Sequence, residues 1–109
     1  MLSEVLIGMK HTLLALTFAL AASAAEYKGW ISDASCGAGN AGSNKAARDC
    51  AESCIKGGSA PVFVTEKEQS VYKVNNAELA KAHLKGKVQI TGELKGDTLH
   101  IAKIVDIKD

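Results

Sequence analysis

Residues 87–107 read KVQITGELKGDTLHIAKIVDI, and this stretch decides the fold. Over its first half, apolar and polar residues alternate with a period of two, as in a strand that buries one face. The apolar set is Val88, Ile90 and Leu94, and the polar set is Lys87, Gln89, Thr91 and Glu93. The sequence therefore predicts a strand at 87–94, followed by a turn at 95–97.

The second half of this stretch continues the apolar face, with one irregularity. The apolar residues of this half are Leu99, Ile101, Val105 and Ile107. Lys103 breaks the alternation and Ile104 lies on the opposite parity, so we expect a β-bulge or a strand that changes sides.

Outward from this hairpin, the sequence predicts further short elements. Strands are expected at Tyr27–Asp33, Pro61–Thr65 and Val71–Val74, a helix at Lys45–Lys56, and a shorter helix at Ala77–Leu84 that ends by Gly86. Five short strands with a helix before the last hairpin are typical of an OB-type barrel. We therefore predict a mainly β fold with one or two short helices, a small OB-like five-stranded barrel with a helix inserted after the first strand.

The predicted helix at 45–56 follows a glycine-rich loop at 37–43 and has a complete apolar stripe. The stripe consists of Ala47, Cys50, Ala51, Cys54 and Ile55. The opposite side is expected to face solvent and carries Lys45, Arg48, Asp49, Glu52, Ser53 and Lys56. Ser43 or Asn44 can cap its start, and Gly57 with Gly58 can end it.

The first 24 residues are typical of a cleaved signal peptide. A short basic start at Lys10 and His11 precedes the apolar run 13–22, and Ala22-Ser23-Ala24 has the small-residue pattern of a cleavage site. The run is too short for a permanent membrane anchor. Met9 is the better start, because Met1 would place Glu4 in a region that should be basic. We predict a signal peptide at 1–24, a single exported OB-like domain at 25–109, and a periplasmic or secreted bacterial protein.

The charge balance argues against a polyanion as partner. The chain has 13 basic and 12 acidic side chains, and removal of residues 1–24 takes away one of each, Lys10 and Glu4, so the net charge stays +1. Nucleic-acid binding needs clustered positive charge, so we expect none.

Cys36, Cys50 and Cys54 are the most informative residues, because export to an oxidising compartment favours a disulfide. Cys50 and Cys54 lie four apart on one helix, with β-carbons about 5–6 Å apart, whereas a disulfide prefers about 3.8 Å. We therefore favour Cys36–Cys54, with Cys36–Cys50 as the alternative, and the third thiol as a small buried apolar group. The competing hypothesis is a thiol or metal-binding protein that uses all three cysteines for zinc or copper. A redox enzyme is less favoured, because the spacing is not Cys-x-x-Cys.

The remaining polar and aromatic residues suggest binding rather than catalysis. Tyr27 and Trp30 are candidates for a stacking platform, and the helix start at Asn44 and Lys45 is a candidate anion site. The isolated carboxylates Asp33, Asp49 and Glu52 are interpreted as solvated surface, and no catalytic set can be assembled. We predict a non-enzymatic binding or interaction module without a cofactor, whose partner is a small molecule, an oligomer or a protein that the sequence does not identify. The oligomeric state is left open.

Three segments carry a resemblance to a known group of proteins. They are Gly29-Trp30-Ile31-Ser32-Asp33-x-x-Cys36-Gly37, Cys50-x-x-x-Cys54-Ile55-Lys56-Gly57-Gly58 and Thr91-Gly92-x-Leu94-x-Gly96-Asp97-Thr98. Together they resemble a family of small, uncharacterised exported bacterial proteins. The resemblance implies an OB-like β domain and carries no established activity or catalytic residues.

Overall fold

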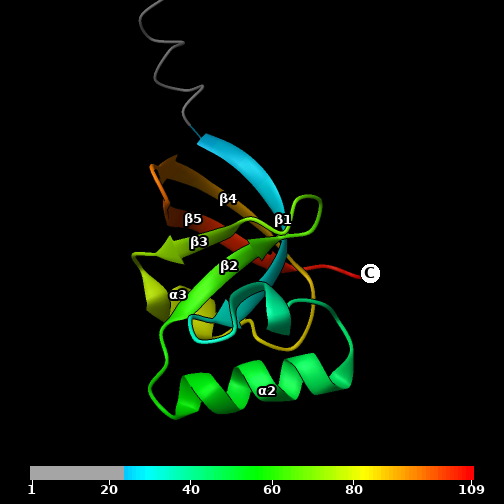
Figure 1. The fold of residues 1–109 in the computed structure, drawn as a ribbon. Coiled ribbons are helices and arrows are strands. Elements are labelled where there is room, and N and C mark those ends of the chain that lie inside the picture. The colour runs from blue at the N-terminus through cyan, green and yellow to red at the C-terminus, as the bar shows by residue number, and fades with distance from the viewer. Residues whose placement is uncertain (1–23) are drawn as a thin grey trace, which may run out of the picture.

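Five strands form one sheet that closes on itself in the computed structural model, which describes residues 24–109 (Figure 1). The strand order is β1-β2-β3-β5-β4, and β4 pairs back with β1. In chain order the elements are β1 (Ala24–Asp33), the 3-10 helix η1 (Gly37–Asn40), α2 (Lys45–Lys56), β2 (Pro61–Thr65), β3 (Val71–Val74), α3 (Ala77–Lys81), β4 (Val88–Lys95) and β5 (Thr98–Asp106). The prediction of a mainly β fold is confirmed, whereas the predicted signal peptide falls outside the described residues except for Ala24.

The first strand changes partner at Gly29. Its first half pairs with β4 and its second half pairs with β2, and Gly29 itself lies opposite both Val88 and Thr65. A β-carbon at this position would overlap the backbone carbonyl of Val64. Glycine is required here because the neighbouring backbone occupies the space of a side chain.

The seam between β3 and β5 is short and is completed by side chains. These strands run parallel and pair at two positions, Lys73 with Thr98 and Val74 with Leu99. Beyond them, the Asn76 amide donates to the Ile101 carbonyl at 2.7 Å and accepts from the Ile101 N–H at 2.9 Å. The side chain of Asn76 thus replaces the backbone partner that β5 lacks at this point.

The β4–β5 hairpin has the predicted turn and a bulge. Gly96 lies in the turn with a φ of +61°. Thr91 pairs with Lys103 whereas Gly92 pairs with Ile101, which leaves Ala102 as the extra residue of β5. After the bulge, the side chains of β5 alternate in the opposite order, so that a residue expected on one face of the sheet lies on the other.

This reversal corrects the predicted apolar face of β5. Ile104, expected on the opposite face, packs against the core. Val105, expected on the core face, is 39% exposed.

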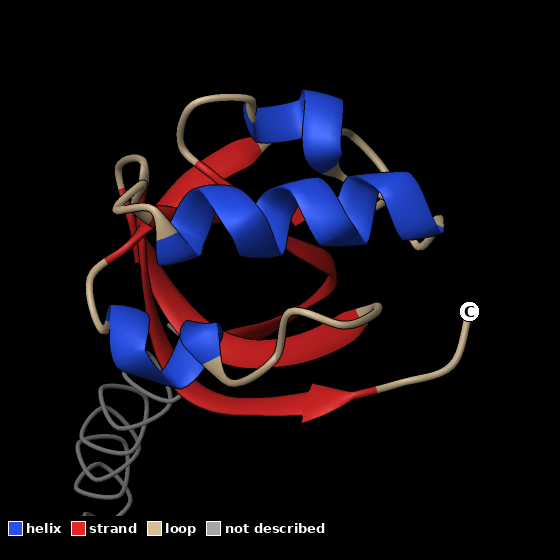
Figure 2. Cartoon of the chain, turned by 90° about the horizontal axis from the view of Figure 1, so that it is seen from below, coloured by secondary structure: helices blue, strands red, loops and turns tan. Residues whose placement is uncertain are grey.

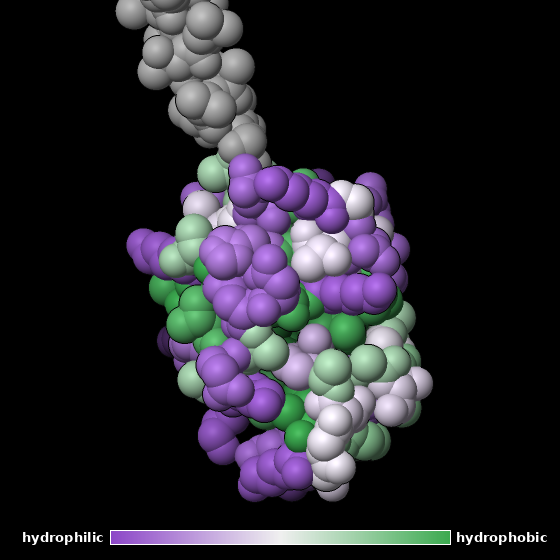
Figure 3. Space-filling model, turned by 90° about the vertical axis from the view of Figure 1, so that its left-hand side faces the viewer, coloured by the Kyte–Doolittle hydropathy of each residue, from purple (hydrophilic) through white to green (hydrophobic). Residues whose placement is uncertain are grey.

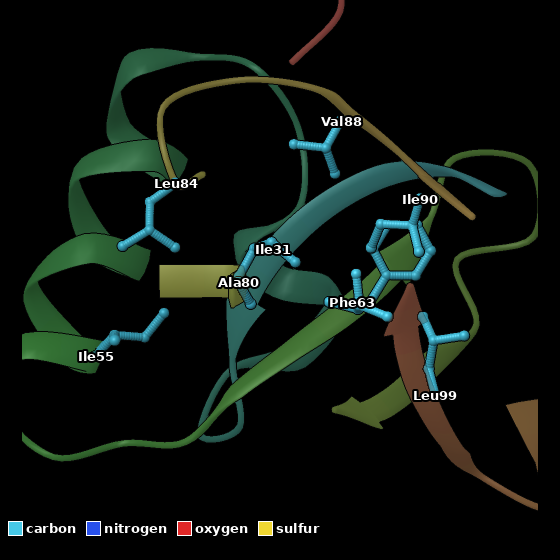
Figure 4. Packing of buried hydrophobic residues seen from close by; sticks show 9 residues of the cluster. Ile31, Ile55, Phe63, Ala80, Leu84, Val88, Ile90 and Leu99 are labelled. Carbon is cyan, nitrogen blue, oxygen red and sulfur yellow. The ribbon is translucent and has the colours of Figure 1, made fainter. Parts of the chain in front are cut away.

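The core fills the interior of the closed sheet and extends to the helices (Figure 4). Its buried members are Ile31, Ile55, Phe63, Ala80, Leu84, Val88, Ile90, Leu99 and Ile101. Ile55 comes from α2 and Ala80 from α3, so both helices are anchored to the sheet by burial of apolar area.

The helices gather at one end of the sheet. Figure 2 looks onto this end, with α2 in front of the strands and the shorter helices on either side of it. The bounds of α2, β2 and β3 agree with the prediction, but α3 ends at Lys81 rather than at Leu84. Leu84 is still buried. Hydrophilic and hydrophobic residues are interspersed on the face shown in Figure 3. Among the described helices, none has the length and apolar character needed to span a membrane.

Candidate functional site at the junction of β1 and α2

The buried face of α2 differs from the predicted stripe. Ala47, Ala51 and Ile55 are buried as expected, but Cys50 is exposed and Cys54 is half-buried. Arg48, expected in solvent, is 6% exposed. The assignment of Arg48 to the solvent-facing side was therefore wrong, and the reason lies in its hydrogen-bond partners.

Arg48 binds four backbone carbonyls from three separate segments of the chain. Its guanidinium donates to Ile31 of β1 at 2.9 Å, to Asn40 of η1 at 2.6 Å, to Gly42 at 2.8 Å, and to Leu84 beyond α3 at 2.9 Å. Burial lowers the pKa of Arg48 from its ordinary value, but an arginine stays protonated in a protein. The carbonyl dipoles thus satisfy a buried cation and fix α2 to the end of the sheet.

Asp33, interpreted from the sequence as solvated surface, is completely buried. One carboxylate oxygen accepts from the side-chain amide of Asn40 at 2.8 Å, and the other accepts from the backbone N–H of Cys36 at 3.0 Å. This prediction was wrong because η1 folds back over the end of β1 and removes Asp33 from water. In contrast, Asp49 and Glu52 form surface ion pairs with lysines of the same helix, Lys45 and Lys56.

Outward-facing side chains of β1 hold the glycine-rich segment. The Ser32 hydroxyl donates to the Gly37 carbonyl at 2.7 Å, and the Trp30 indole donates to the Ser43 hydroxyl at 2.8 Å. Gly37 has a φ of +53°, a conformation that favours glycine. The segment between β1 and α2 is therefore a fixed part of the structure, although the sequence predicts a loop.

The three cysteines lie beside this segment, and the structure shows them in the reduced state. The carboxylate of Asp33 raises the pKa of Cys36, with smaller contributions from burial and from Cys50. Burial raises the pKa of Cys54, followed by Asp33 and by the thiols of Cys50 and Cys36. Each of these thiols therefore lies within electrostatic reach of the other cysteines and of Asp33.

This environment disfavours the thiolate. A nucleophilic or metal-binding cysteine needs a lowered pKa, usually from a nearby cation or a helix N-terminus. Here the carboxylate of Asp33 raises the pKa of Cys36 and burial raises the pKa of Cys54, so both thiols remain protonated at neutral pH. Within residues 24–109, no three histidine, cysteine or acidic side chains converge in a way that would hold a metal ion. The disulfide between Cys36 and Cys54, or Cys36 and Cys50, stays a prediction.

The structure separates the two aromatic residues predicted to form a platform. Tyr27 packs against the core, with its ring centroid 6.4 Å from that of Phe63 and 6.5 Å from that of Tyr72. Trp30 lies three residues later, so its side chain leaves the opposite face of β1. Trp30 is 9% exposed, and the ammonium of Lys87 lies 5.6 Å from the centroid of its ring. The two rings thus do not share a binding face.

The predicted anion site at the start of α2 uses its polar groups internally. The side chain of Asn44 caps the helix by accepting from the N–H of Ala47 at 2.9 Å. The ammonium of Lys45 pairs with Asp49 at 2.6 Å. These contacts confirm Asn44 as the cap, and they favour a structural role for both candidates.

A groove of about 510 Å³ lies on another part of the surface. It is lined by Glu26–Lys28 of β1, Thr65–Glu68 at and after the end of β2, and Gln89 of β4. Sequence reasoning missed this groove, apart from Tyr27, because it forms where β1 leaves β2. A glycine flanked by charged and aromatic residues inside a strand was the available signal of such a change of partner.

Comparisons of the chain with protein-family models, with curated protein sequences and with solved structures give no match.

Proposed function

We propose that this protein is an exported, non-enzymatic binding module with an OB-type barrel, in which one disulfide fastens the inserted helix. The strand order β1-β2-β3-β5-β4, the parallel pairing of β3 with β5, and the position of α3 between β3 and β4 support the OB-type assignment. The groove beside β1 is the surface that we assign to binding.

The placement of the cysteines carries the proposal. Cys36 follows the end of β1, and Cys50 and Cys54 lie on the inserted helix, so a bond from Cys36 would tie the insertion to the sheet. Asp33 disfavours thiolates at this place, which supports a structural cross-link over a reactive thiol. A cross-link from Cys36 to Cys54 would contribute about 3 kcal/mol in the chain-entropy account, a large share of a small domain's stability.

The test uses the protein recovered from the exported fraction of cells. We expect a mature N-terminus at Ala25, an intact mass lower by two hydrogen atoms than after reduction, one titratable thiol, and a linked peptide pair containing Cys36 and Cys54. Three titratable thiols, or zinc or copper in stoichiometric amount, would contradict the proposal and favour the thiol or metal-binding alternative. A Cys36→Ser variant, which lacks both favoured pairings, serves as the control for the mass shift.

A further inference from the structure

Because β1 changes partner at Gly29, each half of the strand has one edge that no other strand of residues 24–109 pairs; we call these two edges half-edges. Before Gly29, β1 pairs with β4, and from Gly29 onward it pairs with β2. The first half-edge belongs to 24–28 and faces away from β4, and the second belongs to 30–33 and faces away from β2. In the described part of the chain, no strand lies beside either of them. Backbone groups on such an edge need other hydrogen-bond partners.

Side chains close the second half-edge. The guanidinium of Arg48 donates to the carbonyl of Ile31 at 2.9 Å and occupies this edge. The β3–β5 seam is completed in a similar way by the amide of Asn76, which bonds both backbone groups of Ile101. At these two places the fold protects the backbone where strand pairing stops.

The first half-edge differs, because among the described residues a hydrogen bond closes it at Lys28 only. The N–H of Glu66 donates to the carbonyl of Lys28 at 2.8 Å, which shows that the backbone groups of Lys28 point to this side. Because successive residues of a strand alternate, the N–H and C=O of Glu26 point to the same side. Within residues 24–109, the connection after β2 makes one backbone hydrogen bond with this half-edge, the bond from Glu66 to Lys28.

The groove runs along this open half-edge. Glu26–Lys28 form one side and Thr65–Glu68 form the other. Glu66 is paired with Lys87, whereas the exposed carboxylate of Glu26 stands on the open edge itself. A chain lying in the groove would therefore meet the N–H and C=O of Glu26, which no strand among residues 24–109 pairs. It would also meet charges of both signs, the carboxylates of Glu26 and Glu68 and the ammonium groups of Lys28 and Lys67, with Glu26 on the open edge.

We propose that the half-edge at Glu26 binds an extended peptide segment, which adds to the sheet as a short strand in the groove. This inference rests on the proposed binding function and names its partner class. Backbone hydrogen bonds to the N–H and C=O of Glu26 hold the segment, as in other cases of strand addition. A lysine or arginine of the segment opposite Glu26 adds a cross-strand charge pair.

Hydrogen exchange of the free exported protein tests the open edge without any ligand. The amide of Glu26 points to the groove and that of Tyr27 points to β4, so we expect Glu26 to exchange about a hundredfold faster or more. The comparison uses protein with a short Gly-Ser extension before Ala25, because fraying at the mature N-terminus would otherwise speed exchange at Glu26 as well. Equal protection of the two amides would overturn this inference, because the edge would then be closed. That result would leave the disulfide and the proposed binding module untouched.

Titration with a defined peptide tests occupancy. The probe is a capped pentapeptide, Thr-Val-Lys-Val-Thr, and its matched control carries proline in place of lysine, which removes the central backbone donor. We expect amide chemical-shift changes confined to 26–28, 65–68 and Gln89 with the first peptide and none with the second. Equal binding of the two peptides, or no shift at millimolar concentration, would overturn the inference.

Two substitutions at Glu26 separate backbone binding from charge. Glu26→Pro removes the free N–H, which does not serve the pairing with β4, and should weaken binding of the lysine peptide about tenfold or more. Glu26→Gln keeps the backbone and should weaken it less. Melting temperatures establish that both variants fold. A dimer that forms with rising concentration and is lost in Glu26→Pro would assign the edge to a second copy of the chain and contradict the peptide proposal.

Discussion

Asp33 and Arg48 are joined through Asn40, which donates its side-chain amide to the carboxylate of Asp33 and accepts from the guanidinium of Arg48 at its carbonyl. The two buried charges are thus held by one residue of η1. This arrangement ties β1, η1 and α2 into one polar cluster that contains no water-exposed charge.

Replacement of Arg48 tests whether this cluster stabilises the fold. Arg48→Lys keeps the charge but cannot reach four carbonyls in three segments at once, so we expect a loss of about 3 kcal/mol or more. Urea unfolding measures the loss. The control is Lys45→Ala on the exposed side of the same helix, which should cost about 0.5 kcal/mol or less. Similar losses for the two variants would show that the buried contacts of Arg48 contribute little.

Replacement of Asp33 tests its influence on the thiols. Asp33→Asn removes the negative charge that raises the pKa of Cys36 and contributes to that of Cys54, so both pKa values should fall. The reduced variant should react faster with iodoacetamide at pH 8 than the reduced parent protein. Asp49→Asn is the matched control, and its alkylation rate should not change. An unchanged rate in Asp33→Asn would contradict the electrostatic role of Asp33.

The reduced protein should lose stability at alkaline pH. Its folded state raises the pKa of Cys36 and Cys54 above the ordinary thiol value of 9.0, so folding favours the protonated form. The stabilisation is complete below that value and disappears as the pH rises through the folded pKa values. Chemical unfolding of the reduced protein between pH 7 and 11 measures this loss. The double variant Cys36→Ser/Cys54→Ser should show a smaller decline over the same range, and an identical decline would exclude the thiols as its cause.

The change of strand partner depends on Gly29. Gly29→Ala would place a β-carbon against the Val64 carbonyl, and we expect a loss of about 2–4 kcal/mol in the free energy of unfolding. Gly86→Ala is the matched control, because a β-carbon at that position has open space around it. Thermal unfolding of both variants gives the comparison. A Gly29→Ala protein as stable as Gly86→Ala would mean that β1 does not approach β2 so closely.

The β3–β5 seam depends on Asn76. Asn76→Ala removes both hydrogen bonds to Ile101, and the cost should be about 2–3 kcal/mol. Hydrogen exchange should show selective loss of protection at the Ile101 amide. Asn75→Ala, which removes an exposed contact with His100, is expected to leave this amide protected. Equal exchange at Ile101 in both variants would contradict the proposed closure of the seam.

Much of the secondary structure could be predicted because it depends on local periodicity. The 3.6-residue pattern and the cap at Asn44 gave α2 its observed bounds. Strict alternation gave the β4–β5 hairpin, and the break at Lys103 indicated the bulge at Ala102. The sequence did not show which residue would be left unpaired. Because Ala102 is the unpaired residue, Ile104 rather than Val105 lies against the core.

The candidate site was less predictable because it depends on contacts distant in sequence. Arg48 is buried by the carbonyls of Ile31 and Leu84, which lie 17 and 36 residues away. Asp33 is buried by a segment that sequence analysis treats as a loop. A local pattern places a charged residue such as Arg48 on the solvent-facing side of a helix. Only hydrogen-bond partners from distant parts of the chain show that it is buried.

The pairing of β1 with β4 has a consequence for the order of folding. The two strands lie far apart in the chain, so the sheet closes only when most of the polypeptide is available. The β4–β5 hairpin, whose contacts are local, is expected to form early, and the N-terminal strand docks late. If the chain is exported across a membrane from its N-terminus, as proposed, its first strand would emerge unpaired, and the fold would be completed after translocation rather than during it.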